Sequence, residues 1–227
     1  MKEARPETRR IGLLIPSSNT VVEQEATRLI PQDGSVSLHF SRFQVTTISA
    51  DSDSVRQFEQ DGMLQAALLL ADAKVDRIAW AGTAASWLGI GQDEAFVSEM
   101  EARCGIPTTT AVLAINKRLS QLGARRIGLV TPYIAALERQ IVDNYKGMGI
   151  EVVASRRLNL TVNTEYADVD ETQIEEMVRN VTEPKPDAIV IMCTNLRFGI
   201  EASQLELELC TPIIDSVAAT IAACLGA

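Results

Sequence analysis

The chain has 227 residues, of which 46% are hydrophobic, so it can bury a substantial core as one large domain or two small, closely packed ones. Its formal net charge of −9 and its pI of about 4.8 argue against a nucleic-acid partner, because binding phosphates requires a clustered positive surface. Residues 1–10 contain no apolar segment, and no apolar run approaches the ~20 residues of a bilayer-spanning helix. These features predict a soluble cytoplasmic protein with no membrane segment.

Short apolar runs of strand length alternate with longer segments of helical periodicity. In chain order, strands are predicted at 11–15, 36–43 and 78–81. The expected helices begin within 16–20 and run toward Ile30, include the apolar positions Val55, Phe58, Leu69 and Leu70 after a polar loop at 51–54, and cover 93–103 and 110–121. This alternation predicts an α/β fold with a mainly parallel sheet that helices cover on both faces.

The pattern occurs twice along the chain. Three pairs of segments are similar and occur in the same order with nearly constant spacing: RIGLLIP at 10–16 and RIGLVTP at 126–132, DRIAWAGT at 76–83 and DAIVIMCT at 187–194, and Ile106-Pro107 and Thr211-Pro212. We therefore predict two pseudo-symmetric Rossmann-like halves. The first half would span 1–116, joined by the C-terminal helix 216–227, and the second would span 117–215.

Such symmetry predicts a single cleft between the halves. Loops that follow equivalent strands would face one another there, and ligands of open α/β sheets bind at the carboxyl ends of the strands. Hydroxyl, amide and backbone N–H groups near helix starts are suited to holding a carboxylate. Gly82 occupies the position in the first half that Cys193 occupies in the second. Four turns would line the cleft, at 16–20, 82–86, 132–135 and 193–197.

The side chains needed for metal or triad chemistry are scarce. The cysteines at 104, 193, 210 and 224 form no C-x-x-C pair, and His39 is the single histidine, so we expect no metal site. A Ser-His-Asp triad is disfavoured because His39 lies in the alternating segment 36–43, which is typical of a strand. We predict a structural role for His39, and core or helix-end positions for Cys104, Cys210 and Cys224.

Three motifs together resemble the aspartate/glutamate racemase superfamily, and within it the branch of maleate cis-trans isomerases and arylmalonate decarboxylases. They are PSSNT at 16–20, TPY at 131–133 and CTNLR at 193–197. The resemblance implies two Rossmann-like halves with the active site between them and neither a metal nor an organic cofactor. Racemases of the superfamily carry one cysteine in each half, and maleate isomerases also use two. Here Cys193 matches the second cysteine and Gly82 replaces the first, as in the arylmalonate decarboxylases.

The resemblance also implies roles for individual residues. Cys193 would be the catalytic proton donor, and Thr83 and Tyr133 would hold the carboxylate and the developing enediolate. Asn19 resembles the carboxylate-binding asparagine of the isomerases, whereas Ala84 stands where the decarboxylases carry a serine hydroxyl. The full set of expected substrate-binding residues is Pro16, Asn19, Gly82, Thr83, Ala84, Tyr133, Asn163 and Thr194.

Other residues near the turns have alternative interpretations. Trp87 and Leu88 are candidates for an apolar wall that would expel water from a leaving carboxylate, or for ordinary core. Arg197 could bind substrate or pair with an acid such as Glu206.

Three functions remain open from the sequence. The first is a cofactor-free decarboxylase or related lyase that acts on a small malonate-type acid and uses a single cysteine as proton donor. The second is a maleate isomerase-like or racemase-like enzyme in which water or another side chain replaces the missing cysteine. The third is a non-catalytic protein that binds a small dicarboxylate. In each case the expected partner is a small carboxylic acid, and a homo-oligomer remains open.

Overall fold

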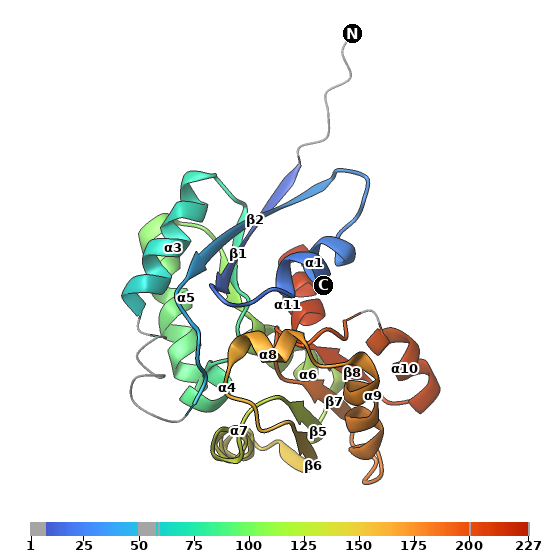
Figure 1. Cartoon of the computed structure of the whole chain (residues 1–227). Helices are drawn as coiled ribbons and strands as arrows, with labels where there is room; N and C mark the ends of the chain where they lie inside the picture. The colour runs from blue at the N-terminus through green and yellow to red at the C-terminus, as the bar shows by residue number, and fades with distance from the viewer. Residues whose placement is uncertain (1–7, 50–57, 59, 200, 227) are drawn as a thin grey trace.

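The computed structural model describes residues 8–49, 58, 60–199 and 201–226. Within this part of the chain, eight parallel strands form two sheets of four (Figure 1). The first sheet has the order β2-β1-β3-β4 and comprises β1 (Arg9–Pro16), β2 (Val36–Phe43), β3 (Arg77–Trp80) and β4 (Thr108–Thr110). The second has the order β6-β5-β7-β8 and comprises β5 (Arg126–Thr131), β6 (Glu151–Arg157), β7 (Ala188–Ile191) and β8 (Ile213–Asp215).

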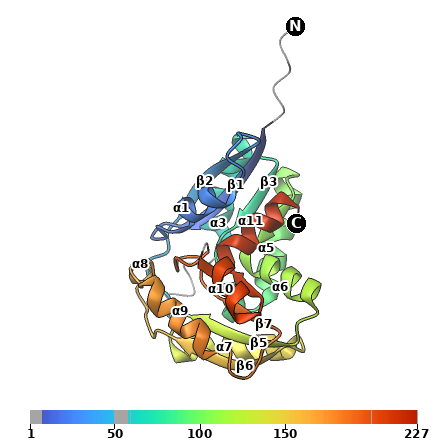
Figure 2. The same cartoon turned by 90° about the vertical axis from the view of Figure 1, so that its right-hand side faces the viewer.

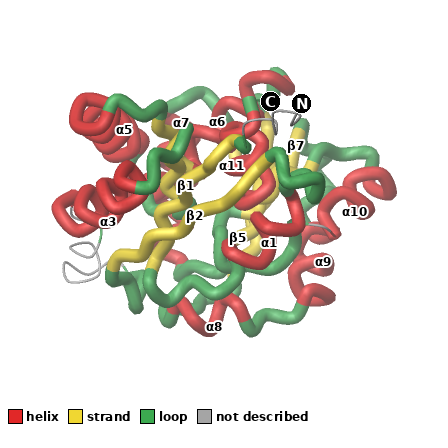
Figure 3. Tube along the Cα trace, turned by 90° about the horizontal axis from the view of Figure 1, so that it is seen from above, coloured by secondary structure: helices red, strands yellow, loops and turns green. Residues whose placement is uncertain are grey.

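Helices cover both faces of the first sheet. Ile11, Leu13 and Ile15 of β1 belong to one buried cluster with residues of α1 and α11, whereas Leu14 belongs to another cluster with residues of α3. Alternate residues of a strand point to opposite faces, so this apolar run serves two layers. Figure 3 shows α3 and α1 on opposite sides of β1 and β2. The helices are α1 (Val22–Leu29), α3 (Gln60–Asp72), α4 (Ala85–Leu88), α5 (Ile90–Cys104), α6 (Ala111–Leu122), α7 (Ala135–Gly147), α8 (Asn163–Ala167), α9 (Glu171–Asn180), α10 (Glu201–Leu209) and α11 (Ser216–Leu225).

The identical strand orders confirm the predicted α/β fold and its repeated pattern. The three pairs of similar segments correspond to β1 and β5, β3 and β7, and the residues around β4 and β8. The last helix, α11, crosses back and packs on α1, α6 and the first sheet, and Figure 2 shows it beside elements of that sheet. The exact division at 116 and 215 stays a prediction.

The glycine shared by the two RIGL segments allows close packing in both sheets. A Cβ atom on Gly12 would lie 3.1 Å from Val75 Cγ2, and one on Gly128 would lie 2.9 Å from Val181 Cγ2. A Cβ atom on Gly128 would therefore be closer to Val181 than real Cβ atoms approach their neighbours, whereas one on Gly12 would fit only if Val75 shifted by a few tenths of an ångström.

We predict that Gly128→Ala lowers the free energy of unfolding by about 1–3 kcal/mol, because the added methyl group would overlap Val181. Gly147→Ala is the matched control, since Gly147 lies in α7 and a Cβ atom there would meet no atom within 4 Å. Urea unfolding measures both. Equal stability of the Gly128 variant and the parent would contradict the close contact.

The structure refines several predicted elements. The expected helix at 110–121 is α6, preceded by the short strand β4, which the sequence pattern did not reveal. The helix expected at 93–103 begins earlier, at Ile90, directly after Gly89 with its φ of 104°. The polar loop at 51–54 and Val55 lie outside the described residues. No described helix is long and apolar enough to cross a membrane.

Candidate functional site

One cavity is lined by all of the predicted site residues. It lies where the carboxyl ends of β1, β3, β5 and β7 open toward one another, and it is lined by Pro16, Asn19, Gly82, Thr83, Ala84, Tyr133, Asn163, Cys193 and Thr194. Ile48, Phe58, Trp80, Trp87 and Asn195 complete the lining. The geometry brings the predicted residues together, while their chemical roles stay predictions. A larger groove between α6 and α11 contains none of them.

The cavity is narrow and its lining is uncharged. Its volume of about 20 Å³ has room for roughly one water molecule, so a substrate must displace some of these side chains to bind. The described residues around it include no Lys, Arg, Asp or Glu. A carboxylate would therefore be held by neutral hydrogen-bond donors rather than by an ion pair.

Cys193 follows β7 and is almost fully buried, with 3% of its surface exposed. The backbone N–H of Asn195 donates to its Sγ at 3.3 Å, and Tyr133 lines the same cavity. Burial nevertheless raises the pKa of the thiol to about 12, because the favourable contacts of Asn195, Tyr133 and Leu196 with a thiolate offset only part of its desolvation. At neutral pH Cys193 is a thiol, which can donate a proton.

Two hydroxyl groups meet beside this thiol. Thr83 Oγ1 from the first half and Tyr133 Oη from the second share a hydrogen bond of 2.7 Å. The Tyr133 ring is fixed edge-on against Trp87 and Tyr166, with centroid distances of 4.6 Å and 5.8 Å. Burial raises the pKa of Tyr133 above its ordinary value, so its hydroxyl keeps its proton and remains a donor.

The turn after β1 is held to the turn after β7. Asn19 Oδ1 accepts from the backbone N–H groups of Val21 and Val22, both at 3.0 Å, which starts helix α1. Asn19 Nδ2 donates to Thr194 Oγ1 at 3.3 Å, and that hydroxyl donates to the carbonyl of Ala81 at 2.9 Å. An amide nitrogen carries two hydrogens, so Asn19 retains a second one for a ligand.

Asn195 lines the cavity as part of the predicted turn at 193–197, but it was not among the expected substrate-binding residues. Its Oδ1 accepts from Thr20 N–H at 3.1 Å, and its Nδ2 donates to the carbonyl of Asn163 at 2.6 Å. The Asn163 side chain in turn donates to Ser18 Oγ at 2.7 Å. The predicted Asn163 thus lies at the cavity as part of a buried chain of amides that joins the two halves.

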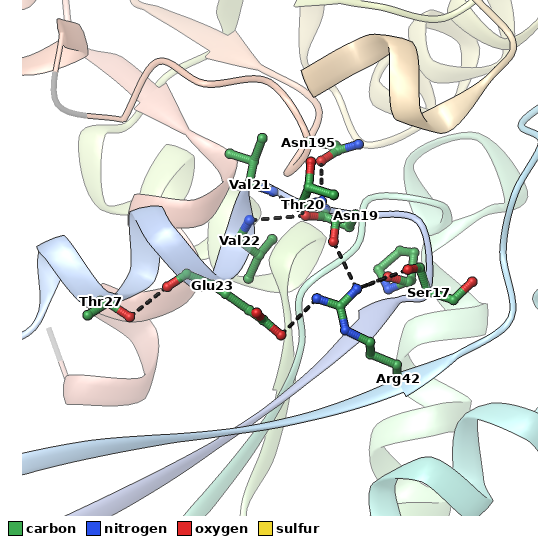
Figure 4. A network of polar contacts seen from close by, with 10 residues as sticks. Ser17, Asn19, Thr20, Val21, Val22, Glu23, Thr27, Arg42 and Asn195 are labelled. Atoms are coloured by element: carbon green, nitrogen blue, oxygen red, sulfur yellow. Dashed lines mark hydrogen bonds and ion pairs between the residues drawn. The ribbon is translucent and has the colours of Figure 1, made fainter. Parts of the chain in front are cut away.

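Arg42 is a residue that the sequence pattern missed. From β2 its guanidinium donates to the carbonyls of Ser17 and Asn19, each at 3.0 Å, and pairs with Glu23 at 2.8 Å (Figure 4). It fixes the backbone of the turn that presents Asn19 to the cavity. Only a contact between distant segments gives Arg42 this role, and no local motif marks it.

Some predictions need correction. The suggested pair of Arg197 with Glu206 is wrong, because Arg197 donates to Gln24 Oε1 at 2.9 Å while Glu206 accepts from the backbone of Ile213. Arg197 does not line the cavity either, and Leu88 faces a neighbouring cavity while Trp87 faces the site. Trp80, Ile48 and Phe58 were missed as lining residues.

The other candidates lie away from the cavity. His39 is on β2, where its Nε2 contacts Ser37 Oγ at 3.2 Å. Cys224 is buried in α11, Cys104 ends α5, and Cys210 is exposed after α10. Among the described residues, no group of three or more His, Cys, Asp or Glu side chains is placed to hold a metal ion.

Comparison with known proteins identifies relatives of this chain in both sequence and structure. The chain is 27% identical over 226 residues to a maleate isomerase of Geobacillus stearothermophilus, covering 93% of this chain and 88% of the relative. It is 24% identical over 218 residues to the arylmalonate decarboxylase of Bordetella bronchiseptica, covering 92% and 86%. The crystal structure of a maleate isomerase from Pseudomonas putida superposes with a TM-score of 0.87 at 25% identity, covering 97% of this chain and 92% of that one.

These relatives confirm the resemblance that the three motifs indicated, and they favour an enzyme over a binding protein. The sequence model of arylmalonate decarboxylase matches residues 11–227, which is nearly the whole chain. The chain belongs to the arylmalonate decarboxylase family.

Proposed function

We propose that this protein is a cofactor-free decarboxylase of a small malonate-type acid and that Cys193 is its single proton donor. The observation that carries the proposal is one buried, protonated thiol in the cavity. Gly82, which holds the equivalent position in the first half, presents no side chain there. Delivery of a proton from one side needs a single acid, and Cys193 is the single thiol among the described residues that line the cavity.

The proposed reaction has three steps, namely loss of carbon dioxide, proton transfer to carbon and reprotonation of the thiolate, and its atoms and charges balance. The bond between the α-carbon and one carboxylate breaks, carbon dioxide leaves, and the electron pair forms an enediolate on the remaining carboxylate. Cys193 then transfers its proton to the α-carbon, and the resulting thiolate regains a proton from water. The net reaction consumes one proton and needs no oxidant, reductant or cofactor.

Neutral donors stabilise the enediolate in this account. The hydroxyls of Thr83 and Tyr133 and the second amide hydrogen of Asn19 are aimed at the cavity from three separate turns. Donors held in place in a water-poor site stabilise developing charge without reorganising during the reaction. Trp87 and Phe58, whose ring centroids lie 6.1 Å apart, form an aromatic wall of the cavity. This wall would remove water from the leaving carboxylate and so favour its loss as carbon dioxide.

The runner-up function is a maleate isomerase-like reaction, which the names of several relatives favour. Addition of sulfur to a double bond requires a thiolate. A thiol with a pKa of about 12 supplies very little thiolate at neutral pH, and a bound dicarboxylate would raise that pKa further. This electrostatic argument ranks decarboxylation first.

A substrate panel and a pH profile test the proposal together. We expect carbon dioxide release from substituted malonates, with no conversion of maleate to fumarate. The rate of the proton-transfer step should not follow loss of the thiol proton between about pH 5 and about pH 9, because a raised pKa keeps the thiol protonated throughout that window. Fumarate production that rises with pH as thiolate forms would support the isomerase instead.

A further inference from the structure

Trp80 closes the side of the cavity where Gly82 lies. It is the last residue of β3, with 2% of its surface exposed, and its ring packs on Phe43 of β2 with centroids 5.0 Å apart. Residues two apart on an extended chain point to the same face. The side chains at positions 80 and 82 therefore compete for the same space.

The indole already fills that space. A Cβ atom built on Gly82 would lie 2.1 Å from Trp80 Cζ2 and 2.3 Å from Cη2, far inside van der Waals contact. In the second half the equivalent positions hold Ile191 and Cys193, a smaller side chain followed by one that reaches the cavity. A large residue at the strand end thus accompanies glycine in one half, and a smaller one accompanies the thiol in the other.

The same indole separates two cavities. A second cavity behind the site is lined by Met63, Leu88 and Phe96 among others, and Trp80 also lines it. Phe58 and Ala84 are shared by both cavities as well. Trp80 is the largest of the three shared side chains, so removing its ring would join the two spaces into one longer, mainly apolar pocket.

We propose that Trp80 is the specificity-determining residue of this site: its indole limits the size of the α-substituent of the acid and occupies the place of a second proton-transferring side chain. This inference rests on the proposed function for its substrate class. The steric part of the inference does not rest on the proposed function, because a side chain at position 82 would overlap the Trp80 indole whichever substrate the enzyme converts.

The steric part is tested by a double-mutant cycle on thermal stability. Gly82→Ala in the parent should lower Tm by about 2–10 °C, because the new methyl group overlaps the indole. In a Trp80→Ala background the same change should shift Tm by less than about 2 °C, because the space is empty. Additive Tm shifts would overturn the proposal without reference to any activity.

The specificity part is tested by the ratio of kcat/KM for naphthyl-substituted over methyl-substituted malonate. Trp80→Ala should raise this ratio at least about tenfold, and Trp80→Leu serves if the alanine variant does not fold. Phe96→Ala is the matched control, because Phe96 lines only the second cavity and its removal leaves the indole wall in place. An equal rise in the control, or no rise in either Trp80 variant, would overturn the proposal.

A binding measurement separates this inference from the proposed function. If no protein in the series decarboxylates any malonate, the proposed reaction fails. Calorimetry with phenylacetate and 1-naphthylacetate then decides the role of Trp80. Preference for the larger acid that appears only in the Trp80 variants would support the size limit, and an unchanged preference would refute it.

Discussion

Cys193→Ala is expected to lower kcat by about 10²- to 10⁴-fold, the range typical for loss of a positioned general acid. The substitution removes the thiol that faces the cavity and leaves an apolar side chain of similar size in a buried position, so the fold should persist. Steady-state kinetics with a substituted malonate measures the loss, and circular dichroism checks the fold.

Cys210→Ala is the matched control for this variant. Cys210 is exposed after α10 and lies outside the cavity, so its removal should leave kcat within about twofold. Retention of most activity in Cys193→Ala would mean that water or another group delivers the proton.

Tyr133→Phe is expected to lower kcat by about 10²- to 10³-fold, with a smaller change in KM. The variant removes the hydroxyl that bonds to Thr83 in the cavity shared with Cys193, which is the loss of one donor to the developing enediolate. The phenyl ring would keep its packing against Trp87 and Tyr166, so the loss should be chemical rather than structural.

Tyr145→Phe provides the comparison. Tyr145 is equally buried, but its hydroxyl donates to Asn116 Oδ1 at 3.0 Å and it does not line the cavity. That variant should lose about 0.5–1.5 kcal/mol of stability and almost no activity. Equal kinetic losses in both tyrosine variants would show that Tyr133 acts through packing alone.

The sequence was most informative where local patterns decide structure. The apolar runs and the paired RIGL segments predicted strands that the structure contains, because a parallel strand buried on both faces is apolar along its whole length. The turns at 16–20 and 193–197 were recognisable because Asn19 and Cys193 lie within three residues of the ends of β1 and β7. The short strand β4 was missed because three threonines carry no apolar signal.

The rest of the site depends on contacts between distant segments. Arg42 reaches the Asn19 turn from the neighbouring strand. Ile48 and Phe58 reach the cavity from outside the described helices and strands, although Phe58 was expected within the helix that the structure begins at Gln60. Trp80 could have been inferred, since its position two residues before Gly82 places both on one face of the strand. The cytoplasmic location, the homo-oligomer and the absence of a nucleic-acid partner stay predictions.

The measurement that tests the central claim most directly is the enantiomeric composition of the acid formed from 2-aryl-2-methylmalonate. A single thiol at Cys193 delivers the proton from one side, so the account predicts one enantiomer in large excess, with carbon dioxide released in equal amount. A racemic product formed by the enzyme, or conversion of maleate without any decarboxylation, would contradict it.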